Sequence, residues 1–127
     1  MKKLKIYGPK KITERKINIG LIGCGRISDK HIEAIFKNQE DLLLKAICDT
    51  DEVRLKEKKN TILKEQVKSN KTNQINTYQS YADFLKDVEK ENLQIDLIIL
   101  TTPSGLHPLQ TIEASKLGIN VCTEKPM

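Results

Sequence analysis

The chain has 127 residues, a length that supports one domain with a real hydrophobic core. Its 22 Lys+Arg against 17 Asp+Glu give a mixed surface, without the basic, aromatic-interleaved stripe of nucleic-acid readers. The sequence has no apolar window long enough to cross a membrane, and its three cysteines have neither Cys-x-x-Cys spacing nor a nearby histidine pair. We therefore expect a cytoplasmic protein that binds no nucleic acid, no membrane and no metal.

The first part of the chain differs in composition from the rest. Residues 1–16 are rich in lysine around a short apolar run and a Gly8-Pro9 turn. Because chain ends are usually poorly ordered, we expect a mobile basic extension here. The domain itself is predicted over residues 17–127.

Strand and helix signals alternate through this domain. Short apolar runs predict strands at 17–22, 43–48, 75–78, 95–100 and 120–123. Ser80 is predicted to cap a helix whose apolar residues recur at i, i+3, i+4 and i+7, while Pro108 and Gly118 mark the start and the end of the last helix. Parallel strands joined by right-handed helical crossovers satisfy this order, so the predicted fold class is α/β with a doubly wound parallel sheet.

Ligands of such sheets bind outside the carboxyl ends of the strands. The first predicted strand is followed there by a G-x-G-x-x-S variant of the Rossmann dinucleotide fingerprint. Gly23 would make the tight turn and Gly25 would let a pyrophosphate approach the backbone, with Arg26 and Ile27 opening the helix whose free N–H groups face the phosphates. By itself the motif also fits a structural turn, and Arg26 could touch the pyrophosphate or be a solvated residue.

Asp49 follows the second predicted strand, where a carboxylate can accept hydrogen bonds from the adenosine ribose hydroxyls. Since a carboxylate there repels a 2′-phosphate, the predicted cofactor is NAD rather than NADP. The alternative is that Asp49 or Asp51 only caps the next helix. A lone histidine, His31, and the three small thiols are interpreted as packing residues.

Two more groups lie at the ends of the last predicted strands. The loop of residues 101–108 follows the fourth strand, and Lys125 follows the fifth. At the functional edge of the sheet, Lys125 is the best candidate for a catalytic residue. The alternative is a solvent-facing lysine that precedes the turn residue Pro126.

Together, the glycine turn, Asp49, the 101–108 loop and the sequence Glu124-Lys125-Pro126 resemble the Gfo/Idh/MocA oxidoreductase family over residues 17–127. Within this family, the two short motifs TPSGLHP and TEKPM are most similar to UDP-N-acetylglucosaminuronate 3-dehydrogenases of bacterial surface-polysaccharide synthesis. The resemblance implies a Rossmann-type domain, NAD as the cofactor and a sugar nucleotide as the substrate.

The resemblance also implies roles for individual residues. It places the nicotinamide side of the cofactor against the 101–108 loop, His107 at the edge of the substrate cleft and Lys125 at the reacting hydroxyl. The further cofactor-binding residues that it implies are Thr101, Thr102, Pro103, Leu106, His107 and Glu124. As a base, Lys125 would need its pKa lowered by about three units from near 10.4, and burial and the positive nicotinamide ring act in that direction. Alternatively, Lys125 stays charged and a histidine transfers the proton.

Family members normally continue into a sixth strand and an α+β domain that closes the substrate cleft and builds oligomer contacts. The chain corresponds to the nucleotide-binding half, so we expect it to bind NAD without turning over a sugar alone, and expect a homo-oligomer in the full-length form. Two alternatives remain open. One is a dehydrogenase of another sugar or of inositol, and the other is a non-catalytic nucleotide-binding regulatory module.

Overall fold

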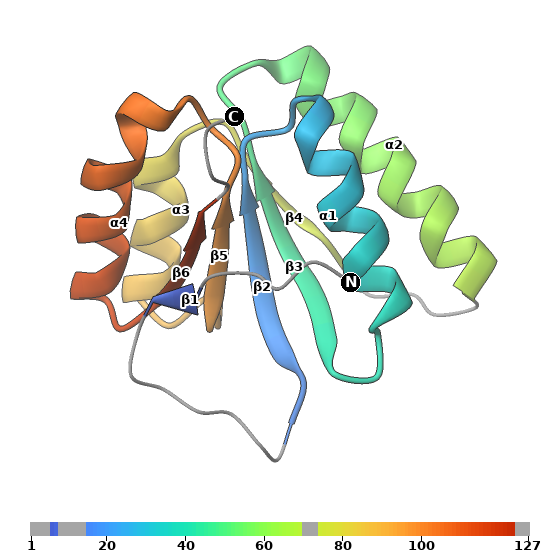
Figure 1. Cartoon of the computed structure of the whole chain (residues 1–127), viewed down its shortest axis with the longest axis horizontal. Helices are drawn as coiled ribbons and strands as arrows, with labels where there is room; N and C mark the ends of the chain where they lie inside the picture. Colours follow the sequence, from blue (N-terminus) through green and yellow to red (C-terminus); the bar gives the residue numbers. More distant parts are fainter. Residues whose placement is uncertain (1–5, 8–14, 70–73, 124–127) are drawn as a thin grey trace.

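A computed structural model describes residues 6–7, 15–69 and 74–123 (Figure 1). The strands are β1 (Ile6–Tyr7), β2 (Ile17–Ile22), β3 (Leu42–Cys48), β4 (Asn76–Tyr78), β5 (Leu97–Leu100) and β6 (Asn120–Thr123). The helices are α1 (Arg26–Lys37), α2 (Glu52–Ser69), α3 (Tyr81–Glu89) and α4 (His107–Lys116), with a short 3-10 helix η1 (Ser104–Leu106) ahead of α4.

The strands form one sheet in the order β1-β6-β5-β2-β3-β4. The pairs from β6 to β4 are all parallel, and β1 runs antiparallel to β6. Helices α1 and α2 cover one face of the sheet, while α3 and α4 cover the other (Figure 1). This arrangement confirms the predicted α/β class with a doubly wound parallel sheet.

Each face of the sheet has its own apolar core. Because side chains alternate along a strand, neighbouring residues of β2 point to opposite faces. Leu21 belongs to the core that includes Ile32 of α1, whereas Ile22 belongs to the core that includes Phe84 of α3. All four side chains are at most 2% exposed, so both helical layers are fixed against the central strand.

The predicted helix ends are confirmed. The N–H group of Asp83 donates to the Ser80 hydroxyl at 3.3 Å, as expected of an N-cap. Pro108 lies in the first turn of α4, and Gly118 has the left-handed φ of 76° just beyond its end. In the part of the chain that the structure describes, no helix is both long and apolar enough to cross a membrane.

The interpretation of residues 1–16 as a mobile extension is wrong for Ile6–Tyr7. These two residues form β1 and pair with Cys122 and Val121 of β6. The edge of β6 presents backbone N–H and C=O groups that need partners, and a strand-forming Ile-Tyr pair supplies them. Arg15 is also held in place, because its guanidinium donates to the carboxylate of Asp96.

Candidate functional site

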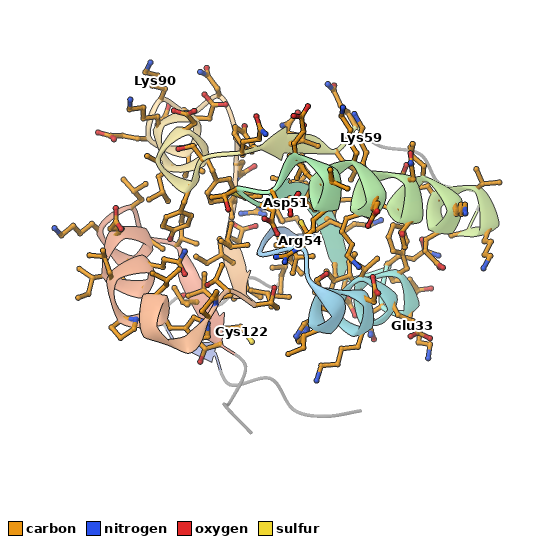
Figure 2. All side chains as sticks on the ribbon, turned by 90° about the horizontal axis from the view of Figure 1, so that it is seen from above. Glu33, Asp51, Arg54, Lys59, Lys90 and Cys122 are labelled. Atoms are coloured by element: carbon orange, nitrogen blue, oxygen red, sulfur yellow. The ribbon has the colours of Figure 1, made fainter. Side chains whose placement is uncertain are left out.

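The carboxyl ends of β5, β2 and β3 lie side by side at one edge of the sheet. The chain leaves β2 toward β3 on one side and returns to β5 on the other, which makes this edge the topological switch point where such folds bind ligands. Figure 2 looks onto the molecule from above and shows Asp51 and Arg54 beside each other at the start of α2.

The loop after β2 is a turn that requires glycine. Gly23 has φ 98°, a conformation that residues with a side chain rarely adopt. A Cβ atom at Gly23 would lie 2.8 Å from Thr101 Oγ1, so no larger residue fits. The Gly23 N–H donates to the carbonyl of Cys48 at 2.7 Å, and the Thr101 hydroxyl donates to the carbonyl of Gly23 at 2.7 Å. The structure therefore brings three loops of the edge together at Gly23.

The second glycine of the motif leaves space for a ligand. Gly25 is the N-cap residue of α1, and a Cβ atom built on it would have no neighbour within 4 Å. The N-terminus of a helix with open space above it fits the pyrophosphate of a dinucleotide. Ser28 is fully buried behind the turn and its hydroxyl donates to the Gly25 carbonyl at 2.5 Å, which explains the small third residue of the motif.

Asp49 and Asp51 have different tasks. Asp51 caps α2, because its Oδ1 accepts from the N–H groups of Val53 at 2.9 Å and Arg54 at 3.3 Å. Asp49 instead accepts the N–H of Cys24 on Oδ2 and the N–H of Asp51 on Oδ1, both at 2.8 Å. The capping alternative therefore holds for Asp51, while the Asp49 carboxylate lies against the glycine turn. Ribose binding by Asp49 stays a prediction.

A small polar network supports the loop after β5. The Thr102 hydroxyl donates to Gln110 Oε1 at 2.6 Å, and the Tyr81 hydroxyl donates to the Gln110 carbonyl at 2.7 Å. His107 Nε2 lies 2.7 Å from the Thr102 carbonyl. No local pattern of the sequence assigns Gln110 or Tyr81 to the site, and the only signal for Gln110 is an amide in a helix position that proves to be buried.

Exposed apolar groups flank the site. Ile27 in the first turn of α1 is 50% exposed and Leu106 in η1 is 48% exposed. Pro103 in the loop after β5 is exposed as well. Such side chains can pack against the flat faces of a nucleotide. The backbone of Arg26 begins α1, and the predicted residues Glu124 and Lys125 lie outside the described residues.

The thiols near the site are packed and unreactive. Burial and, to a lesser extent, the nearby Asp49 carboxylate raise the pKa of Cys24 and of Cys48 to about 12. A thiol with such a pKa is protonated at neutral pH and is a poor nucleophile. His31 is 5% exposed within α1, as a packing residue would be. Among the described residues, no cluster of His, Cys, Asp or Glu could hold a metal ion.

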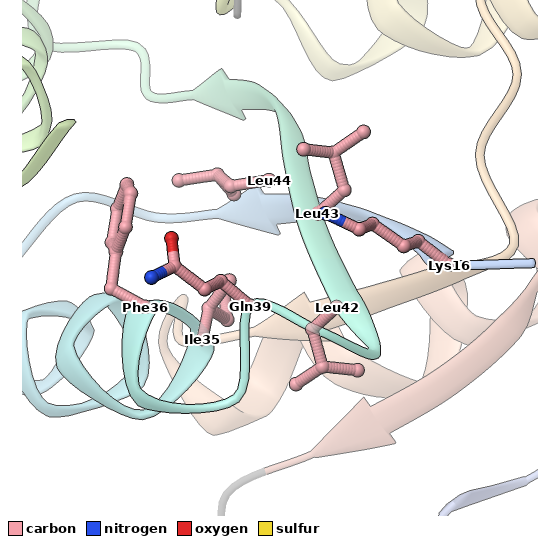
Figure 3. Close-up of a pocket in the computed structure, with 7 residues that line it drawn as sticks. All are labelled: Lys16, Ile35, Phe36, Gln39, Leu42, Leu43 and Leu44. Atoms are coloured by element: carbon pink, nitrogen blue, oxygen red, sulfur yellow. The ribbon is translucent and has the colours of Figure 1, made fainter. Parts of the chain in front are cut away.

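One small cavity lies at the opposite, amino-terminal end of the sheet (Figure 3). Its volume of about 20 Å³ is enough for one water molecule and far too small for a nucleotide. It is lined by Lys16, Ile35, Phe36, Gln39, Leu42, Leu43 and Leu44. This cavity therefore has no room for a nucleotide, whereas the space above Gly25 at the carboxyl end of the sheet is open.

The sheet, the glycine turn and the placed carboxylate define a dinucleotide-binding domain of the Rossmann type. The family model named GFO_IDH_MocA, an oxidoreductase family with an NAD-binding Rossmann fold, matches residues 17–127. The chain belongs to the Gfo/Idh/MocA oxidoreductase family, and its cofactor is NAD.

Solved structures and curated relatives agree with this assignment. WlbA dehydrogenase from Bordetella pertussis, solved with NADH and UDP-GlcNAcA, is 37% identical with a TM-score of 0.72, covering 89% of this chain and 30% of that chain. The myo-inositol 2-dehydrogenase of Lactobacillus plantarum is 28% identical with a TM-score of 0.68, covering 88% and 29%. A glycosyl hydrolase family 109 protein of Shewanella baltica is 32% identical over 111 residues, which are 87% of this chain and 23% of that protein.

The chain thus spans less than a third of the length of each of these proteins. What is common to them over this span is the nucleotide-binding domain. The substrate and the partners of the whole protein are therefore proposed and not shown.

Proposed function

We propose that this chain is the NAD-binding half of a dehydrogenase that oxidises the C3 hydroxyl of UDP-N-acetylglucosaminuronate in surface-polysaccharide synthesis. The observation that carries the proposal is the identity of 37% to a WlbA dehydrogenase solved with NADH and UDP-GlcNAcA. The glycine turn of the present chain supports it, because the turn has the conformation and the open space that the cofactor needs.

Different described residues would bind different parts of the cofactor. Gly23 and Gly25 would let the pyrophosphate reach the N-terminus of α1, and Asp49 would accept the ribose hydroxyls. Thr102 and Leu106 would bound the nicotinamide side. NAD, when bound, supplies the acceptor for the hydride that leaves the substrate carbon. What these residues contribute is the position and orientation of that acceptor.

The proton of the substrate hydroxyl needs its own acceptor. We assign it to Lys125, which follows Thr123, the last residue of β6, by a short step along the chain. β6 runs parallel to β5, so the two strands end at the same edge of the sheet. The parallel register supports a lysine near the cofactor, and Glu124 beside it would contact the cofactor.

The rest of the whole protein would complete the substrate site. A chain that spans 30% of WlbA leaves the uridine and uronate groups to other parts of such an enzyme. We propose that these parts close the cleft and form a homo-oligomer. The thiols of Cys24 and Cys48 are buried and form no disulfide, which supports a reducing, cytoplasmic location.

The test is NADH formation by the full-length protein with NAD and UDP-N-acetylglucosaminuronate, followed by absorbance. Lys125→Ala should lower kcat by at least about 100-fold, because it removes the proton acceptor, while NADH affinity stays within about twofold. Lys116→Ala is the matched control, since this exposed lysine ends α4 on the outside of the domain. Unchanged turnover in the Lys125 variant would remove the lysine from the mechanism.

Two other reactions have support from a specific relative. Identity of 28% to a myo-inositol 2-dehydrogenase supports an inositol or another free sugar as the substrate. Identity of 32% to a glycosyl hydrolase family 109 protein supports glycoside cleavage. The same assay separates them, because an inositol dehydrogenase forms NADH from the inositol, whereas a hydrolase releases a sugar without net NADH. A regulatory module would bind NADH and turn over none of these compounds.

A further inference from the structure

The Thr101 hydroxyl is engaged by the glycine turn. Thr101 Oγ1 lies 2.7 Å from the Gly23 carbonyl and 3.1 Å from the Ile22 carbonyl. The Thr101 N–H also donates to the Ile22 carbonyl at 2.8 Å. A hydroxyl has one proton, and its two acceptor neighbours are the carbonyls of the last residue of β2 and the first residue of the turn. The side chain therefore ties the end of β5 to the glycine turn.

The contact between these loops is also tight. A Cβ atom on Gly23 would lie 2.9 Å from the Thr101 carbonyl carbon and 3.0 Å from the Thr102 N. The backbone of the 101–102 segment thus lies directly against Gly23. With this packing and the hydrogen bond together, the turn has little freedom to move toward β5.

The opposite side of the turn is held from β3. The Cys48 carbonyl accepts the Gly23 N–H at 2.7 Å, and Asp49 Oδ2 accepts the Cys24 N–H at 2.8 Å. The turn is thus fixed by hydrogen bonds from both neighbouring strands. A loop that is fixed before its ligand arrives loses less conformational entropy on binding.

We propose that Thr101 is a positioning residue for the pyrophosphate turn and acts through Gly23 rather than by contact with the nicotinamide. Its contribution to affinity then falls on the adenosine diphosphate half of NAD. The inference rests on NAD binding by this domain and not on the sugar substrate proposed above, so a different substrate leaves it standing.

The experiment compares two ligands by isothermal titration of the full-length protein. NADH carries both halves of the cofactor, and ADP-ribose lacks the nicotinamide. Thr101→Val keeps the shape but removes the donor to Gly23, so a smaller fraction of the protein has the binding-competent turn. We expect the affinity for both ligands to fall by the same factor, about five- to tenfold.

Two further variants give the result its specificity. Thr101→Ser retains the hydroxyl and should restore both affinities to within about twofold. Thr102→Val is the matched comparison, because the Thr102 hydroxyl donates to Gln110 and not to the turn. It should weaken NADH more than ADP-ribose, which is the opposite signature.

Three outcomes would overturn the inference. Loss of NADH affinity with unchanged ADP-ribose affinity in Thr101→Val would place the side chain at the nicotinamide. Unchanged affinity for both ligands would show that the hydrogen bond does not matter for binding. Failure of the wild-type protein to bind either ligand would remove the premise. Circular dichroism checks that each variant is folded, and Thr101→Ala replaces the valine variant if the latter does not fold.

Discussion

The parallel strands of the sheet have an amino end and a carboxyl end, here the amino edge and the carboxyl edge, and each edge has an aspartate with different partners. At the amino edge, Asp96 is 7% exposed, and its carboxylate accepts both NH groups of Arg15, at 2.6 and 2.7 Å, and the N–H of Asn18 at 2.9 Å. At the carboxyl edge, Asp49 is half-buried and accepts backbone N–H groups from Cys24 and Asp51. One aspartate has a cation of the protein as its partner, and the other takes neutral backbone donors.

The difference teaches where the fold keeps its binding capacity. A carboxylate has about four acceptor positions, so the two backbone donors on Asp49 leave about two for the hydroxyls of a ribose. On Asp96, three positions are occupied, two by the bidentate Arg15 fork and one by the Asn18 N–H. The amino edge therefore serves stability, whereas the carboxyl edge retains acceptors for a ligand.

The largest expected effects are those of alanine at Gly23 and Gly25, which should lower NADH affinity alike but differ in their effect on stability. Gly23→Ala should lower NADH affinity by more than about 100-fold and destabilise the fold by about 3 kcal/mol, because a Cβ at φ 98° would meet Thr101 Oγ1 at 2.8 Å. Gly25→Ala should lower NADH affinity by a similar factor with stability nearly unchanged, since its Cβ has no protein neighbour within 4 Å.

Titration with NADH and urea unfolding measure the two quantities. Ser115→Ala is the control, because this exposed residue near the end of α4 lies outside both the glycine turn and the 101–108 loop. Retained NADH affinity in Gly25→Ala would contradict the pyrophosphate position.

At the amino edge the expected loss is in stability alone. Asp96→Ala should lower the free energy of unfolding by about 2 kcal/mol, because it removes the buried acceptor of the Asn18 N–H. Arg15→Ala should cost much less, since the Arg15 side chain is 44% exposed and water screens its ion pair with Asp96. Urea unfolding gives both values. A tenfold change in the NADH affinity of either folded variant would contradict the assignment of stability to the amino edge and of ligand binding to the carboxyl edge.

The edges should also differ in their response to base. The thiols beneath the carboxyl edge, Cys24 and Cys48, have their pKa raised from 9.0 to about 12 by burial and, to a lesser extent, by Asp49. They hold protons more tightly when folded, so their stabilisation is complete below about pH 9 and is lost as the pH rises toward 12. Stability should fall by about 2 kcal/mol per pH unit above pH 9.5. Urea unfolding at pH 8 and 10.5 measures it, and Cys24→Ala with Cys48→Ala should reduce the slope. The slope that remains comes from Tyr78 and Tyr81, whose pKa burial also raises above the ordinary value.

The fold was predictable from the sequence because its signals are local. Apolar runs of strand length, Ser80 at a helix start and Gly118 after a helix end each reflect a preference of a few residues. The glycine turn and Asp49 were predictable as well, because dinucleotide binding fixes their spacing. In contrast, β1 depends on the edge of β6, more than a hundred residues away in the chain, and two residues of sequence carry no such signal.

The same limit applies within the site. The spacing of the motif locates Gly23 and Thr101 but does not tell that they share a hydrogen bond across 78 positions. Gln110 is a further case, because its link between Thr102 and Tyr81 arises only when α3 and α4 pack on the same face. Contacts between distant segments are set by the packed fold and are not written in any local pattern.

The smallest expected effect concerns which form of the cofactor the carboxyl edge prefers. The Asp49 carboxylate should favour NADH over NADPH, because it accepts the ribose hydroxyls and repels a 2′-phosphate. Asp49→Ser should reduce that preference by about tenfold, or about 1.4 kcal/mol, because it removes the negative charge. The positive charge of Arg54 at the start of α2, whose Nε lies 3.7 Å from Asp51 Oδ2, would then attract the 2′-phosphate. The variant also loses the acceptor for Cys24 N–H, so both affinities should fall, NADH more than NADPH. Fluorescence titration with the two cofactors measures the ratio, and an unchanged ratio would mean that Asp49 only holds the turn, as Asp96 holds the opposite edge.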